Sequence, residues 1–219
     1  MQKKKVILII GGHDPTSGAG ISADIETANY FNFHSLSILT CSTIQNTSKV
    51  IKVNDMPKDY IYNCYKEVIK EFKINVIKIG LLPSIKSSKE VLKIINDRRV
   101  KNIPIIMDPI IKSGSNNKLT TYNNLNYIIK NIYPKAKIIT AIGMFYDMED
   151  PNQFIADSAK ALSEDGVFIA QLMCLKNMLD SNDVGNICHE HLEYYSFKSL
   201  EYLFNKNGLD IFDVEINNV

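Results

Sequence analysis

The chain has 219 residues and a formal net charge of +1, so it can bury a sizeable core as one domain or two small ones, and its charge gives no reason to expect nucleic acid or an anionic membrane as a partner. Its four cysteines form no C-x-x-C pair and have no ligand spacing with the four histidines, which argues against a protein-only metal site and a disulfide framework. No apolar run approaches the ~20 residues that cross a bilayer, and the apolar stretch near Met1 is too short for a signal peptide, so we expect a cytoplasmic protein.

The first predicted unit is a strand, a glycine-rich loop and a helix. Val6 to Ile10 form a short apolar run that is typical of a strand buried on both faces. The stretch from Gly11 to Asp24 follows, and Ser17 is placed to cap a helix whose apolar positions continue to Ala28. Glycines let the backbone approach a ligand closely, and the helix N-terminus favours an anionic or strongly polar one.

This loop fits neither of two common nucleotide motifs. Gly18 to Ala23 matches G-x-G-x-x-A, but Asp14-Pro15 separates it from the strand, and the next strand has no acidic residue to bind a ribose. No G-x-x-x-x-G-K-[ST] occurs anywhere in the chain. We therefore treat the loop as a candidate substrate loop.

Strands and helices alternate along the rest of the first two thirds, which predicts a parallel sheet with right-handed crossovers. The predicted elements are strands at His34 to Thr40, Val50 to Val53, Val76 to Gly80, Ile103 to Met107 and Ala136 to Thr140, and helices through Tyr60 to Phe72 (opening at Pro57), Val91 to Ile95 and Leu125 to Ile132.

The last third continues the α/β pattern. It predicts a helix at Phe154 to Leu162, a strand at Gly166 to Gln171, an irregular polar segment to about Tyr195, a helix through Leu200 and Leu203, and a strand at Leu209 to Ile216. The expected fold is a three-layer, doubly wound α/β protein with one mostly parallel sheet.

Four polar or glycine positions converge at one edge of the predicted sheet. In open parallel sheets, ligands bind outside the carboxyl ends of the strands. Asp14, Gln45, Gly80 and Asp108 each follow or end a predicted strand. The sequence therefore predicts a small-molecule site at this edge.

Several motifs, in order, resemble the hydroxymethylpyrimidine and phosphomethylpyrimidine kinases of thiamine synthesis, over about residues 6–140. They are Gly12-His13-Asp14-Pro15-Thr16-Ser17-Gly18-Ala19-Gly20-Ile21-Ser22-Ala23-Asp24, Thr43-Ile44-Gln45-Asn46-Thr47, Lys78-Ile79-Gly80-Leu81-Leu82, and Met107-Asp108-Pro109-Ile110 with Lys112-Ser113-Gly114. The resemblance implies a ribokinase-like fold, Mg-ATP as cofactor, a small pyrimidine alcohol as substrate, and a homodimer as one option.

The resemblance also implies roles for individual residues. Asp24, Gln45 and the backbone near Gly12 would bind the pyrimidine, Ile110 would wall its pocket, and Asp108 would lie near magnesium or phosphate. Each has a plainer interpretation from the residues alone. Asp24 would be a helix-dipole acid, Gln45 a polar loop residue, Asp108 a strand terminator and Ile110 a core residue.

From about residue 139 to 219 the chain resembles the later half of S-adenosylmethionine-dependent sugar C-methyltransferases. The segment Cys188-His189-Glu190-His191-Leu192-Glu193-Tyr194-Tyr195-Ser196 carries this resemblance. It implies that Glu190 and His191 form an acid–base pair. That family's glycine-rich cofactor loop does not occur in this chain, so S-adenosylmethionine is not an expected cofactor.

We therefore expect a kinase-like part, residues 1–140, and a methyltransferase-like fragment, residues 141–219. The expected function is phosphoryl transfer from ATP to 4-amino-5-hydroxymethyl-2-methylpyrimidine or its phosphate. We expect it to be impaired and assign no catalytic residue, because residues 141–219 contain no Gly-Thr-Gly-Cys-like anion-hole segment. The alternatives are a methyltransferase remnant and a non-catalytic chimeric α/β protein.

Overall fold

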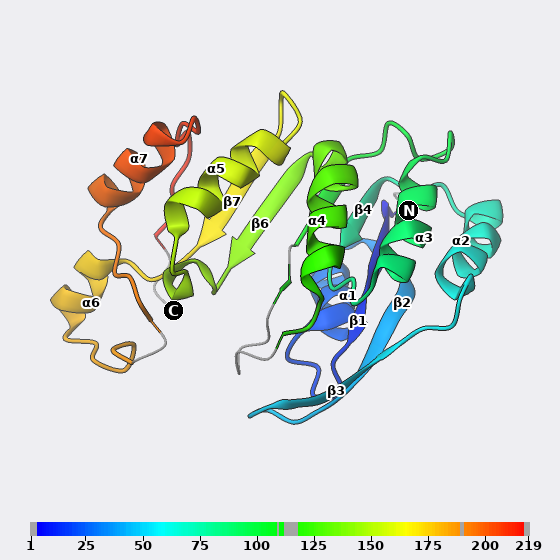
Figure 1. Cartoon of the computed structure of the whole chain (residues 1–219), viewed down its shortest axis with the longest axis horizontal. Helices are drawn as coiled ribbons and strands as arrows, with labels where there is room; N and C mark the ends of the chain where they lie inside the picture. The colour runs from blue at the N-terminus through cyan, green and yellow to red at the C-terminus, as the bar shows by residue number, and fades with distance from the viewer. Residues whose placement is uncertain (1–3, 109, 112–117, 189–190, 217–219) are drawn as a thin grey trace.

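The computed structural model describes residues 4–108, 110, 111, 118–188 and 191–216. Within them, no helix is long and apolar enough to cross a membrane. The elements are β1 (Val6–His13), α1 (Gly20–Tyr30), β2 (His34–Gln45), β3 (Val50–Asp55), α2 (Tyr60–Glu71), β4 (Val76–Ile79), α3 (Ile85–Ile95), β5 (Ile105–Met107), α4 (Tyr122–Asn131), η1 (Tyr133–Lys135), β6 (Ile138–Ile142), η2 (Phe145–Asp147), α5 (Pro151–Ala161), β7 (Val167–Gln171), α6 (Leu175–Ser181) and α7 (Phe197–Lys206) (Figure 1).

The described strands form one sheet in the order β3-β2-β1-β4-β5-β6-β7. Neighbouring strands are parallel except for β2 and β3, which form an antiparallel hairpin. The chain leaves β1 toward β2 on one side and returns to β4 on the other, so the order reverses between β1 and β4. Ligands of such sheets bind at a reversal point of this kind. The predicted mostly parallel α/β fold is confirmed.

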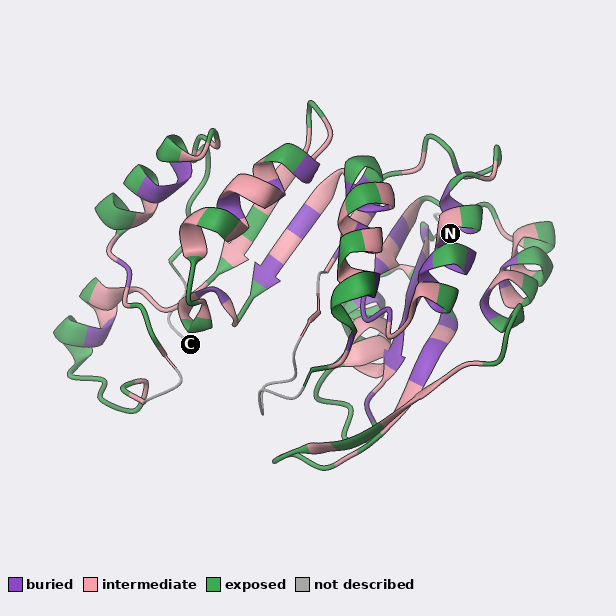
Figure 2. Ribbon diagram, in the orientation of Figure 1, coloured by how far each residue is buried: buried purple, intermediate pink, exposed green. Residues whose placement is uncertain are grey.

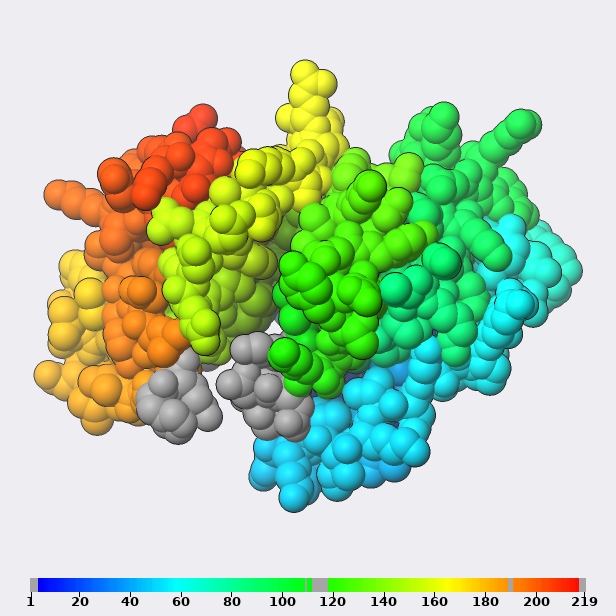
Figure 3. Space-filling view, in the orientation of Figure 1, coloured from blue at the N-terminus to red at the C-terminus, as the bar shows by residue number. Residues whose placement is uncertain are grey.

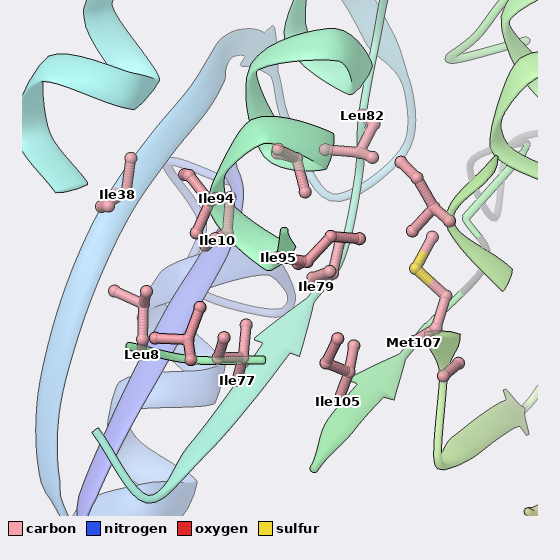
Figure 4. Packing of buried hydrophobic residues seen from close by; sticks show 14 of the residues in the cluster. Leu8, Ile10, Ile38, Ile77, Ile79, Leu82, Ile94, Ile95, Ile105 and Met107 are labelled. Atoms are coloured by element: carbon pink, nitrogen blue, oxygen red, sulfur yellow. The ribbon is translucent and has the colours of Figure 1, made fainter. Parts of the chain in front are cut away.

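The main core lies between the sheet and the helices α2, α3 and α4. Alternate strand residues point into it, since side chains of a strand alternate between faces. Leu8, Ile10, Ile77, Ile79 and Met107 are at most 2% exposed, and Figure 4 shows them packed beside Ile94 and Ile95 of α3. Each buried aliphatic side chain stabilises the fold by about 1.5–3 kcal/mol.

Helix α1 lies on the opposite face, against β1 and β2. Figure 2 shows buried residues gathered along the strands and on the sheet-facing sides of the helices. Ala28 is the buried residue of α1. Asp24 precedes it by four positions, which places both on the same side of the helix, toward the sheet.

Side-chain caps fix where several helices begin. The Ser84 hydroxyl accepts from the Ser87 amide at the start of α3, and the Ser196 hydroxyl accepts from the Ser199 amide at the start of α7. Asp150 caps α5 ahead of Pro151, a residue favoured in a first helical turn. Each such cap contributes about 1 kcal/mol.

The last third adds a strand to the same sheet and a second core. β7 pairs with β6 from Ile138↔Val167 to Ile142↔Gln171. The second cluster is built around Phe145, Ile155, Tyr195, Leu203 and Phe204, and Phe168 of β7 packs against both clusters. In Figure 3 the C-terminal residues form a lobe beside the N-terminal part. Two domains divided near residue 140 stay a prediction, although the sheet runs through both parts.

Three local predictions were wrong. Leu209 to Ile216 forms no strand: its backbone is irregular, and Phe212, Val214 and Ile216 are exposed. Helix α2 begins at Tyr60, because Asp59 before it has a left-handed backbone, with φ 64°. The helix α6 lies inside the segment expected to be irregular.

Candidate functional site

The loop between β1 and α1 is organised by Asp14. Its carboxylate oxygen Oδ1 accepts hydrogen bonds from the backbone amide and the hydroxyl of Thr16, both at 2.8 Å. Asp14 is only 7% exposed. It therefore shapes the turn from inside, as aspartate does in an Asx turn, and this explains its position at the strand end without a ligand.

Helix α1 starts at a glycine that no other residue could replace without strain. Gly20 has φ +66°, and a Cβ built on it would lie 2.4 Å from the carbonyl oxygen of Gly12. The N-cap is Ala19, with no side-chain cap. The predicted Ser17 cap was wrong, because Ser17 has a left-handed backbone with φ 59° before the helix begins.

Gly12 lies near the end of β1, where that strand pairs with Cys41 of β2. It is buried, and a Cβ built on it would lie 2.9 Å from the Cys41 sulfur. The pairing of β1 with β2 shifts register between Gly11 and Gly12. Burial raises the pKa of the Cys41 thiol to about 11, so Cys41 serves as packing beside β1 and not as a reactive thiol.

Lys78 joins two of the predicted site residues. Its ammonium nitrogen lies 2.8 Å from Oδ2 of Asp24 and 3.3 Å from Oδ2 of Asp108. The other oxygen of Asp108 accepts from the Thr140 hydroxyl at 3.2 Å. The side chains of Lys78, Asp24 and Asp108 are 15%, 23% and 28% exposed. We call Asp24, Lys78, Asp108 and Thr140 the edge network.

The edge network lies at the carboxyl ends of the central strands. Lys78 is the third residue of β4, and its ammonium lies close to Gly80. A Cβ built on Gly80 would be 3.2 Å from the Lys78 ammonium nitrogen. Asp108 directly follows β5, and its amide donates to the carbonyl of Ile79 at 2.9 Å. With two carboxylates and one ammonium, the network carries a net negative charge, which suits a ligand that presents hydrogen-bond donors.

Gln45 stands apart from the edge network. It is the last residue of β2 and pairs with Val50, so it belongs to a strand where a loop was expected. The pairing of β2 with β1 stops at Ser42, opposite His13. Three further strand residues place Gln45 about 10 Å beyond that point, on the β2–β3 hairpin.

The structure places two of the other three predicted positions, Ile110 and His191, and not Glu190. Ile110 is half-buried, and its amide donates to the Asp108 carbonyl at 2.9 Å, but residues 109 and 112–117 around it lie outside the described part of the chain. Glu190 also lies outside the described residues. His191 is in the second lobe, where its Nδ1 lies 2.7 Å from the carbonyl oxygen of Asn186 and its ring contacts Tyr146 edge-on.

Two grooves lie near these groups. One, of about 530 Å³, runs over the α1 side of the sheet along Ile7, Ile9 and Ile106, with Asp24 and Lys78 also in its lining. The other, of about 750 Å³, lies beyond the carboxyl ends of β6 and β7 and is lined in part by Gly143, Gln171 and Cys174. Neither lining includes Gly12, Gln45 or Asp108.

Lys78 and Thr140 are the residues of the network that the sequence analysis did not assign to the site. Lys78 had a detectable signal: it interrupts the apolar run Val76-Ile77-Lys78-Ile79, and a charged residue is rarely buried without a partner. Thr140 had no such signal, because threonine is common in strands.

Comparison with known proteins gives a consistent result. The phosphomethylpyrimidine kinase family matches residues 14–143. A hydroxymethylpyrimidine/phosphomethylpyrimidine kinase of Saccharomyces cerevisiae is 30% identical over 141 residues, which are 64% of this chain and 25% of the relative. The chain covers between 25% and 52% of the length of the first four curated relatives that it matches.

Solved structures show the same fold. The crystal structure of a phosphomethylpyrimidine kinase from Clostridium difficile has a TM-score of 0.63 at 25% identity and covers 76% of this chain and 74% of that chain. The pyridoxal kinase of Staphylococcus aureus in complex with AMP-PCP has a TM-score of 0.56 at 19% identity and covers 94% of this chain and 61% of that one, a likeness of fold alone.

The family match begins in the β1–α1 loop and ends just after β6. It thus contains the whole edge network. The comparisons give the methyltransferase resemblance of the last third no support, and that resemblance stays a prediction. Because the matched residues make up more than half of the sequence, the chain belongs to the phosphomethylpyrimidine kinase family.

Proposed function

We propose that this chain acts in phosphoryl transfer from ATP to 4-amino-5-hydroxymethyl-2-methylpyrimidine or its phosphate, and that it binds the pyrimidine at the edge network. The observation that carries the proposal is the ion pairing of Asp24 and Asp108 through Lys78. These residues come from α1, β4 and the end of β5, which are far apart in sequence. The family to which the chain belongs supports the substrate class.

Asp24 is the proposed contact to the pyrimidine amino group. Its Oδ2 is bound by Lys78, and a carboxylate can accept further hydrogen bonds on both oxygens. We propose that Gly12 contributes its backbone and that Ile110 supplies an apolar wall. Gln45 would meet the outer edge of the ring from the β2–β3 hairpin, since it lies beyond the end of β1.

Asp108 is the proposed neighbour of the phosphoryl group. Magnesium in kinases is bound by one or two carboxylates together with substrate phosphates, so a single aspartate fits that need. Within the described ranges, no cluster of three or more metal-ligating side chains exists. Bound magnesium would neutralise charge on the transferred phosphoryl group. The family to which the chain belongs supports ATP as the donor.

The test is a thermal-shift series with the pyrimidine alcohol, Mg-ATP and S-adenosylmethionine as separate ligands. A ligand at 100 times its dissociation constant stabilises the folded state by about 2.7 kcal/mol. For a chain of this size we expect the pyrimidine to raise the melting temperature by about 5–10 °C.

Asp24→Ala should abolish this shift, whereas the matched control Asp165→Ala, at the amino end of β7, should keep it. A pyrimidine that leaves the melting temperature unchanged contradicts the proposal. A shift with S-adenosylmethionine alone would favour the methyltransferase alternative, and a cooperative melt that no ligand raises would favour the non-catalytic one. Turnover measured with Mg-ATP tests the predicted impairment.

A further inference from the structure

We propose that Lys78 is a positioning residue of the pyrimidine site: its ammonium holds the Asp24 carboxylate at the carboxyl end of β4, so that ligand binding depends on Lys78 acting through Asp24. This inference rests on the proposed function and adds a residue to it. The chemistry it requires is that of a neutral heteroaromatic ring whose amino group donates to a fixed carboxylate.

The backbone of Lys78 is held firmly in place. Lys78 pairs with Ile9 of β1 on one side and with Ile106 of β5 on the other, in the middle of the sheet. Its neighbours Ile77 and Ile79 are fully buried on the opposite face. A side chain on such a strand starts from a fixed point, and this precision favours a site residue.

Asp24 has the opposite character. Asp24 lies on helix α1, which packs against β1 and β2. Its backbone is therefore not hydrogen-bonded into the sheet, as that of Lys78 is. The contact at 2.8 Å from Lys78 to Asp24 therefore ties the helix across β1 to the next strand of the sheet. Without the ammonium, the Asp24 side chain would be free to take other rotamers and would turn toward water.

The charges around Lys78 point the same way. Its ammonium is shared between two carboxylates, and Asp108 is also bound by the Thr140 hydroxyl. Removing the ammonium leaves two partly buried carboxylates close together with the cation gone, and like charges at such range repel. Without Lys78, Asp108 would keep its hydrogen bond from Thr140, so the loss of Lys78 would be felt mainly at Asp24.

The experiment is a double-mutant cycle read by calorimetric titration of the full chain with 4-amino-5-hydroxymethyl-2-methylpyrimidine. We expect Lys78→Met to weaken binding about 10- to 100-fold, the usual effect of losing a charged hydrogen bond. In the Asp24→Asn background the same change should cost less than about 3-fold, because its target is already altered. Lys78→Arg should restore most of the affinity.

Lys137→Met is the matched control. This change removes the lysine that forms an ion pair with Asp165 at the amino ends of β6 and β7, away from the site. The variant should bind the pyrimidine as tightly as the parent. Melting curves check that each variant is folded, and Lys78→Gln replaces Lys78→Met if the latter does not fold.

The outcomes separate the two levels of the proposal. If the parent binds, and Lys78→Met binds equally well or loses the same factor in both backgrounds, then Lys78 does not act through Asp24, although the proposed function stands. If the parent itself shows no binding, the proposed function is overturned and the role of Lys78 with it.

Discussion

Replacing Gly20 with alanine should destabilise the fold more than the same change at Gly143 or Gly208, the other glycines with positive φ in the described part of the chain. A left-handed backbone costs an L-residue about 1–2 kcal/mol. At Gly20 the added Cβ would also lie 2.4 Å from the Gly12 carbonyl oxygen, a backbone atom that cannot move without shifting β1. Overpacking of this kind costs a further ~1–3 kcal/mol, so we expect a total loss of about 2–5 kcal/mol.

Gly208 provides the matched control. Its φ is +84°, and a Cβ built on it meets nothing within 4 Å. Gly208→Ala should therefore cost only the backbone term, about 1–2 kcal/mol. Urea denaturation of both variants measures the difference. Equal losses at the two positions would refute the reasoning, because the contact with Gly12 would then contribute nothing.

Three further predictions concern the cores and the surface. Phe145→Ala should lower the free energy of unfolding, measured by urea denaturation, by about 3–5 kcal/mol, because this fully buried ring packs against Phe154, Tyr195 and Phe204. A loss under ~1 kcal/mol would show that the second core is loosely packed. Cys41 should resist iodoacetamide at pH 8 in the folded chain, because its pKa is raised to about 11 and the reactive thiolate is scarce. Mass spectrometry measures the labelling rate, and labelling as fast as in the unfolded chain would contradict this prediction. The hydrogen bonds from Arg99 lower the pKa of Asp97 below its ordinary value of 3.8, so Asp97→Asn should be less stable than the parent at pH 7. The difference in free energy of unfolding between the two proteins should shrink as the pH falls below about 4. A difference that does not change with pH would argue against the ion pair.

The sheet could be predicted because most of its parallel strands contain a short apolar run, although β2 mixes apolar residues with serine and threonine. Val6 to Ile10 and Val76 to Ile79 read as buried strands from their residues, and the alternation with helices predicted that the sheet is parallel. The hairpin was harder. Gln45 lies among polar residues typical of a loop, yet β2 continues through it because β3 supplies an antiparallel partner.

The same limit explains the error at Leu209 to Ile216. Apolar and acidic residues mix along it much as in a strand, apart from the adjacent Ile211 and Phe212. A strand also needs a neighbour with free backbone groups in register, and that depends on how the chain packs. The apolar residues that do find partners, Leu209 and Ile211, pack against the second core.

The site was predicted from strand-end positions and, through the family resemblance, from Asp24 on the first helix, and the structure joins only part of this set. Asp24 and Asp108 come together, which required a third residue, Lys78, whose partners no local pattern could reveal. Asp14 lies at this edge of the sheet, directly after β1, but its carboxylate accepts hydrogen bonds from Thr16 within the loop and does not join the network. Gln45 lies on the hairpin, so any role in binding depends on where the ligand sits.

A crystal structure of the chain soaked with 4-amino-5-hydroxymethyl-2-methylpyrimidine would test the central claim most directly. The edge network predicts the amino group of the ring within hydrogen-bond distance of the Asp24 carboxylate, with the Lys78 ammonium still in contact with that carboxylate. A ring bound instead in the groove beyond β6 and β7, near Gly143 and Gln171, would contradict it.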